Sequence, residues 1–162
     1  MKVRLCRFVW PVGFIVSLMG FGRFFNAYSP AGKTRLVFAM TAVSSGAMFL
    51  IGLIVSAEGD NPSTLSICLC VVLLFITAVG VGLPYYVPSG VFAVRFGEDQ
   101  AGVVSAYLDG TSAIATGLFL KLLAGLVEDG WGTAWLTLGC VGIAMTAAST
   151  LFVHRIYTGK LG

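Results

Sequence analysis

Residues 36–57 read LVFAMTAVSSGAMFLIGLIVSA, a run of 22 residues without a charged side chain. A helix of roughly 20 mainly apolar residues crosses the hydrocarbon core of a bilayer, so this run predicts a transmembrane helix. The whole chain agrees: 57% of its residues are apolar and 10% are charged, against about 45–50% and about 25% in soluble domains. This composition excludes a soluble enzyme, a disordered chain and a nucleic-acid-binding protein, which needs clustered Lys and Arg.

Four further stretches extend the pattern on either side of this run. One of them, residues 132–153, also lacks a charged side chain and qualifies outright, and the others cover residues 8–26, 64–87 and 101–127. Residues 8–26 are the weakest candidate, and they cross the membrane only if the Arg23 side chain reaches back to the interface. We therefore expect an all-α membrane protein with about five transmembrane helices, forming a single domain over residues 1–162 in an integral, multi-pass arrangement in the lipid bilayer.

The distribution of Lys and Arg predicts the orientation of these helices, because cytoplasmic loops are enriched in basic residues. With the C-terminus in the cytoplasm, six basic residues lie inside and three lie outside. The loops at residues 57–62 and 128–131, which carry only acids, then lie outside. The inside set is Arg23, Lys33, Arg35, Arg95, Arg155 and Lys160, and the outside set is Lys2, Arg4 and Arg7.

The basic N-terminus is the exception to this rule. Residues 1–22 also have the pattern of a signal sequence, but Arg23 and two Phe follow where a cleavage site needs small residues. Cleavage would also place Lys33 and Arg35 outside. An odd number of spans with the N-terminus outside instead predicts a truncated protein, whose missing upstream helices would set the orientation.

Neither a metal site nor a catalytic set is visible in the sequence. Cys6, Cys68, Cys70 and Cys140 are scattered in apolar runs, and the chain has one His. Residues two apart on a helix point in nearly opposite directions, so Cys68 and Cys70 lack a metal-binding spacing. We expect free thiols, no metal, no cofactor and no enzymatic activity.

The fourth span carries the most informative side chains. Asp109 lies about eight residues, or about 12 Å, into the helix, where an ionisable group needs water or a partner. Lys121 lies about 18 Å further along, so the two cannot pair within the helix. Asp109 is a candidate for substrate binding or coupling, or for a structural hydrogen bond. Lys121 is likewise a candidate for substrate binding or coupling or for pairing with another helix, and the alternative is that it reaches the outer interface.

Small residues accompany these two charges along the fourth span. They allow either close helix packing or a solute path. Every fourth residue is small or ionisable, and a neighbouring row is small too: Ala101, Ser105, Asp109, Ala113, Gly117, Lys121 and Gly125, and then Gly102, Ala106 and Gly110.

The third span ends in Gly80-Val-Gly-Leu-Pro-Tyr-Tyr-Val-Pro-Ser-Gly90. Proline removes a backbone donor, so Pro84 and Pro88 should bend or break this helix. Tyr85 and Tyr86 are candidate donors in a cavity, or alternatively aromatic residues at the membrane interface.

Three segments resemble the major facilitator superfamily. Residues 85–97 (YYVPSGVFAVRFG), 101–110 (AGVVSAYLDG) and 125–131 (GLVEDGW) are similar to the end of its tenth helix, its eleventh helix and the loop into its twelfth. The organophosphate-antiporter and sugar-phosphate-exchanger-like branch is the most similar in character. The five spans would then be helices 8–12 of a twelve-helix fold. Gly22 and Arg23, with Asn26 in place of an acid and Lys33 and Arg35 beyond, resemble a degraded form of its cytoplasmic loop motif.

The resemblance implies a secondary transporter, or a fragment of one, that moves a small organic solute such as an organic anion or sugar phosphate by alternating access. It makes the first, third and fourth spans cavity candidates, and missing N-terminal helices or self-association would complete the transporter. The alternative is a small non-transporting membrane protein that acts as a scaffold or assembly subunit. The candidate gating and hinge residues are Gly22, Arg23, Asn26, Pro84, Pro88 and Gly110.

Overall fold

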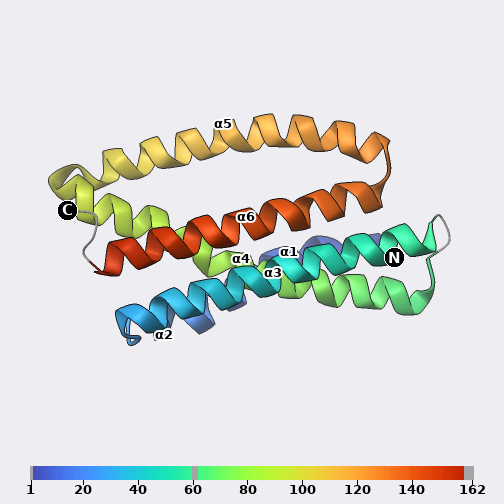
Figure 1. The fold of residues 1–162 in the computed structure, drawn as a ribbon, viewed down its shortest axis with the longest axis horizontal. Helices are drawn as coiled ribbons and strands as arrows, with labels where there is room; N and C mark the ends of the chain where they lie inside the picture. Colours follow the sequence, from blue (N-terminus) through green and yellow to red (C-terminus); the bar gives the residue numbers. More distant parts are fainter. Residues whose placement is uncertain (1, 60–61, 159–162) are drawn as a thin grey trace.

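A computed structural model describes residues 2–59 and 62–158, and over these ranges the chain is helical and contains no strand. Five helical segments are long and apolar enough to cross a membrane (Figure 1), which confirms the predicted all-α membrane fold. The elements are α1 (Lys2–Val16), the π-helical turn η1 (Ser17–Phe21), α2 (Gly22–Phe25), α3 (Pro30–Glu58), α4 (Thr64–Gly97), the 3₁₀ turn η2 (Glu98–Gln100), α5 (Ala101–Glu128) and α6 (Trp131–Thr158). The first candidate span, Phe8–Phe25, runs through α1, η1 and α2.

Local sequence signals set the helix ends. Ser29 caps α3, accepting a hydrogen bond from the Gly32 N–H at 3.2 Å, and Pro30 follows at the first helical position. Because of this cap, α3 begins six residues before the apolar run at residue 36. Gly59 and Gly130 have φ values of +58° and +122°, which favour glycine, and they end α3 and precede α6.

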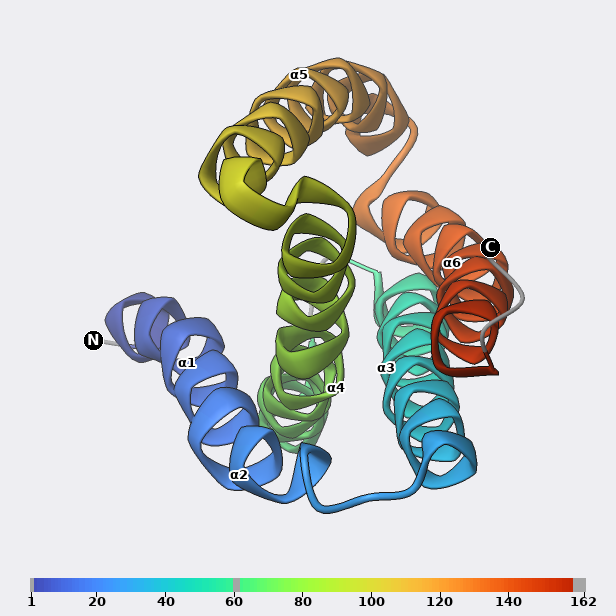
Figure 2. The same ribbon diagram turned by 90° about the vertical axis from the view of Figure 1, so that its left-hand side faces the viewer.

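The helices pack around α3 and α4, as the end-on view in Figure 2 shows. Helix α1 lies beside α4, and α6 lies beside α3. Helix α5 stands apart, packs mainly against α4 and α6, and has no buried residue. It is therefore the helix least supported by the rest of the described chain.

Glycines let the closely packed helices approach one another. A Cβ atom added at Gly80 of α4 would lie 2.6 Å from the Met40 carbonyl oxygen of α3, and one at Gly52 of α3 would lie 2.8 Å from the Leu136 nitrogen of α6. Small residues allow such backbone approach in membrane bundles. By contrast, a Cβ at Gly102, Gly110, Gly117 or Gly125 of α5 would meet no atom within 4 Å.

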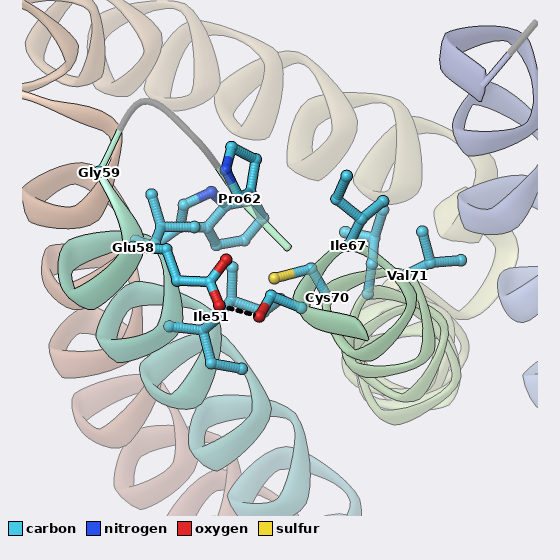
Figure 3. A pocket seen from close by; sticks show the side chains of 12 residues that line it. Ile51, Glu58, Gly59, Pro62, Ile67, Cys70 and Val71 are labelled. Carbon is cyan, nitrogen blue, oxygen red and sulfur yellow. Dashed lines mark hydrogen bonds between the residues drawn. The ribbon is translucent and has the colours of Figure 1, made fainter. Parts of the chain in front are cut away.

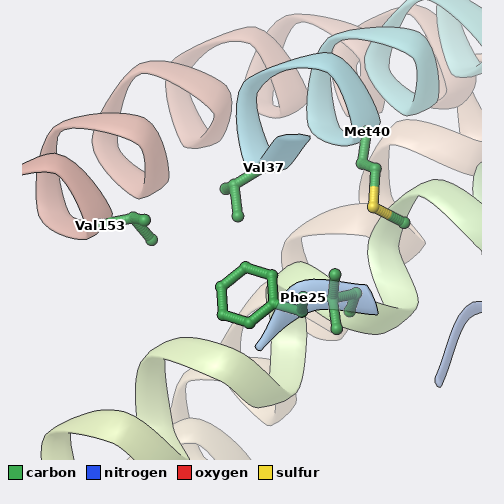
Figure 4. Close-up of a cluster of buried hydrophobic side chains, with 5 residues drawn as sticks. Phe25, Val37, Met40 and Val153 are labelled. Atoms are coloured by element: carbon green, nitrogen blue, oxygen red, sulfur yellow. The ribbon is translucent and has the colours of Figure 1, made fainter. Parts of the chain in front are cut away.

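A cluster of buried apolar side chains lies at the end of the bundle where the chain passes from α2 to α3 (Figure 4). Its members are Phe25, Val37, Met40, Leu83 and Val153. The Lys33 ammonium lies 5.3 Å from the centre of the Phe25 ring and 4.6 Å from that of Tyr157, a cation–π arrangement that covers this cluster.

Helix α4 does not break at its prolines. It continues as one helix of 34 residues through Pro84 and Pro88 to Gly97, ten residues beyond the predicted end of the third span at residue 87. Freed backbone groups near a proline are tolerated inside a membrane when neighbouring helices supply partners. Next to Pro84, the Leu83 N–H donates a hydrogen bond at 2.9 Å to Ser17 Oγ of η1, the π-helical turn that follows α1.

Candidate functional site

A cavity of about 230 Å³ lies in the middle of the bundle among α3, α4, α5 and α6. It is bordered by the central turns of α3 and α6, and Phe119 of α5 closes one side. We call it the central pocket. The residues that line it are Thr41, Ser44, Ser45, Met48, Val81, Pro84, Tyr85, Phe119, Leu138, Val141, Gly142, Met145 and Ser149.

Three hydroxyl groups on the wall of the central pocket donate hydrogen bonds to helix carbonyls. Ser44 Oγ donates to the Thr77 carbonyl of α4 at 3.1 Å, and Ser45 Oγ donates to the Thr41 carbonyl at 2.8 Å. Thr41 Oγ1 donates to the Val37 carbonyl at 2.8 Å. A hydroxyl whose proton is donated still has oxygen lone pairs, so these groups can accept hydrogen bonds from a solute.

The same hydroxyls join helices across the bundle. Ser44 links α3 to α4, and Ser45 Oγ lies 3.3 Å from Thr146 Oγ1 of α6. Ser44 and Ser45 are 2% and 4% exposed. Sequence reasoning did not single them out, although two adjacent serines inside an uncharged run were a usable signal, because polar groups in a membrane interior need partners.

Of the predicted site residues, Pro84 and Tyr85 reach the wall of the central pocket. Tyr86, beside them, belongs to an aromatic cluster between α1 and α4. The ring centres of Tyr85 and Tyr86 are 5.2 Å apart, and they lie 6.1 and 6.0 Å from the ring of Phe14. The two tyrosines, each about half exposed, therefore link the α1–α4 contact to the pocket.

Two irregular helix segments meet next to this cluster. Helix α1 changes to π-helical geometry at Ser17, and Ser17 Oγ accepts a hydrogen bond at 2.9 Å from the Leu83 N–H, one residue before Pro84. Ser17 is fully buried, and a Cβ at Gly82 would lie 2.6 Å from its Cβ. Because π-helical turns often occur at functional sites and prolines are frequent kink positions, this contact is a candidate hinge.

Asp109 and Lys121 lie on α5, outside the central pocket, and both are exposed. Neither forms an ion pair within the described ranges. Twelve residues at about 100° each rotate a helix by about 120°, so the two side chains also point in different directions. The structure does not bring them together.

The every-fourth-residue pattern of the fourth span did not identify the polar face of α5. Ser105, Asp109, Ser112 and Thr116 are spaced i, i+4, i+7 and i+11, which places them on one side of a helix. Ser105 and Ser112 are half-buried, whereas Asp109 and Thr116 are exposed. This face therefore borders the side of α5 that is turned toward α4 and α6.

The remaining gating candidates lie away from the central pocket. Gly22 follows the π-helical turn, Arg23 lies in α2, and Asn26 caps the end of α2. Gly110 faces open space on α5. Pro88 lies within α4, but its side chain is outside the described part of the chain.

Comparison with protein-family models, with curated proteins and with solved structures finds no match for this chain.

Proposed function

We propose that this chain is a transmembrane transporter, or part of one, that moves a small organic solute by alternating access. The observation that supports this proposal best is the central pocket: a cavity of about 230 Å³ halfway along helices that are long enough to cross a membrane. Transporter binding sites lie near the bilayer midplane, often beside interrupted helices.

The candidate hinge supports movement next to this pocket. Pro84 and Tyr85 belong to the pocket wall, and the Ser17–Leu83 hydrogen bond attaches the same turn of α4 to the π-helical turn of α1. A change in the bend of either helix would therefore shift the wall of the pocket.

The lining also guides the choice of solute. The described residues around the central pocket include no charged side chain, and their hydroxyls, which donate to helix carbonyls, have oxygen lone pairs left to accept hydrogen bonds from a solute. We therefore propose a small neutral solute with hydrogen-bond donors for this pocket. The organic anion or sugar phosphate implied by the resemblance would need a basic group from elsewhere, with Lys121 as the candidate.

The likeness to helices 8–12 of the major facilitator superfamily remains part of the proposal. In that arrangement further transmembrane helices, or a second copy of the chain, would complete the solute path. Asp109 would couple the solute path to the gate or to protons.

An uptake measurement tests the proposed function. The protein is reconstituted in liposomes and offered radiolabelled glycerol, erythritol, glucose and glycerol phosphate. We expect uptake of at least one neutral solute above protein-free liposomes, lost in Ser149→Trp, which fills the central pocket, and kept in Ala148→Trp. Ala148 is the matched control because it is the exposed neighbour of Ser149 on α6. Uptake that is unaffected by Ser149→Trp would refute the role of this pocket.

The alternative, a non-transporting scaffold or assembly subunit, has one observation in its favour. Helix α5 has no buried residue, and its four open glycines and the exposed Asp109 and Lys121, which form no ion pair within the described ranges, suit contact with another membrane helix. Absence of uptake for every solute, together with stable binding of another membrane protein that Gly110→Leu abolishes, would favour the scaffold.

A further inference from the structure

A second cavity, of about 300 Å³, lies between α3 and α4 at the end of the bundle where these two helices are connected (Figure 3). We call it the outer pocket. It shares no lining residue with the central pocket. Its wall is mainly aliphatic, with Trp135 contributed by α6, and the lining residues are Ile51, Ile54, Val55, Glu58, Gly59, Pro62, Ser66, Ile67, Cys70, Val71, Leu74 and Trp135.

Among the described residues of the outer pocket, one carboxylate lies at the connection between the two helices. Glu58, the last residue of α3, accepts hydrogen bonds from the Ser63 N–H at 2.7 Å, from Ser63 Oγ at 3.2 Å and from Ser66 Oγ. Three donors on one carboxylate favour its ionised form. A carboxylate has about four acceptor positions, so one remains for a ligand.

No positive charge neutralises Glu58 in the part of the chain that the structure describes, since it forms no ion pair there. Among its described lining residues, the outer pocket thus combines an apolar interior with one negative charge at its edge. Pockets of about 300 Å³ or more that are lined by apolar side chains with a few placed polar groups are typical of small-molecule sites.

Cys70 places a thiol on the wall of the outer pocket. Figure 3 shows its sulfur directed toward the space beside Glu58. Cys70 is half-buried, whereas Cys68, two residues earlier on the same helix, is exposed and does not line the pocket. Residues two apart on a helix point about 200° from each other, so the two thiols face different surroundings.

We propose that the outer pocket binds a single-chain amphipathic amine, with the alkyl chain among the aliphatic side chains and the ammonium group at Glu58. A space of about 300 Å³ holds about ten groups of water size, at about 30 Å³ each, which suits a chain of about ten carbons. Charge complementarity selects the head group, because Glu58 attracts an ammonium and repels a carboxylate. This site is separate from the proposed transport function.

The two cysteines provide the test. The full-length protein in phosphatidylcholine nanodiscs is treated with N-ethylmaleimide, and the modification of Cys70 and Cys68 is followed by mass spectrometry with and without decylamine. When decylamine is present at about four times its dissociation constant, we expect modification of Cys70 to slow about fivefold. Modification of Cys68, the internal control, should not change. Equal slowing of both thiols, or of neither, would overturn the proposal.

Three further comparisons test the charge and the cavity. Decanoate, with a chain of the same length, should protect Cys70 much less than decylamine does, and protection by decanoate that equals that by decylamine would contradict the role of Glu58. Glu58→Gln keeps a hydrogen-bond acceptor for Ser63 and Ser66, and it should remove the preference for the amine. Val71→Trp, which fills the outer pocket without touching Glu58, should abolish protection of Cys70, and undiminished protection would place the ligand elsewhere.

Discussion

Ser17 connects two helices through a single hydroxyl oxygen. It is fully buried, and it accepts the Leu83 N–H at a point where the following proline disturbs the hydrogen bonding of α4. A buried hydrogen bond of this kind contributes about 1 kcal/mol to stability.

We therefore expect Ser17→Ala to lower the free energy of unfolding by about 1 kcal/mol, because it removes a buried hydrogen bond between two helical segments. Thr137→Ala is the matched control, since Thr137 Oγ1 donates to the Thr133 carbonyl of its own helix. The control should change stability by less than about 0.5 kcal/mol. Both variants are measured by equilibrium unfolding in mixed micelles, and equal effects would show that the Ser17 contact contributes nothing specific.

At the scale of the helices, the spacing between α3 and α4 depends on Gly80. The Cβ that any other residue adds would lie 2.6 Å from the Met40 carbonyl oxygen and 2.8 Å from Ser44 Cβ. Because the first of these atoms is backbone, the clash can be relieved only by moving the helices apart. That movement would also lengthen the Ser44–Thr77 hydrogen bond at the central pocket.

Gly80→Ala should accordingly destabilise the protein by about 1–3 kcal/mol, the usual cost of overpacking. Gly46, on α3, has no atom within 4 Å of an added Cβ, so Gly46→Ala should be neutral or stabilising by up to about 1 kcal/mol. Thermal unfolding of the two variants in the same detergent compares them. A Gly80→Ala protein as stable as Gly46→Ala would mean that α3 and α4 do not pack this closely.

The number of spanning helices follows from the sequence, since each apolar run is long enough to cross a membrane and the turns between the runs are short. The ends of these helices are less predictable from the sequence. Hydropathy ends the third span near Pro88, yet α4 continues through both prolines to Gly97, and next to Pro84 the Leu83 N–H donates to Ser17, 66 residues away in the sequence. The start of α3 depends on the Ser29 cap, which lies outside the apolar run.

At the scale of the whole molecule, some residues of the candidate site could be predicted from the sequence and others could not. Pro84 and Tyr85 could be selected from their own sequence context, and both line the central pocket. Ser44, Ser45 and Ser149 come from helices that the sequence treats only as apolar runs, and their convergence depends on which faces of α3 and α6 meet. Helical periodicity along one segment carries no information about that pairing.

The most direct test of the account is access to the central pocket from both sides of the membrane. Single cysteines are introduced into a chain whose four native cysteines are replaced by alanine, and sealed vesicles are treated with a membrane-impermeant thiol reagent on either face. Tyr28→Cys and Pro62→Cys, both exposed and at opposite ends of the bundle, should react from the cytoplasmic and the outer face respectively. Ala148→Cys, exposed beside the pocket but not lining it, should react from neither. Alternating access predicts that Ser149→Cys reacts from both faces, whereas a Ser149→Cys protein that is protected from both would contradict it.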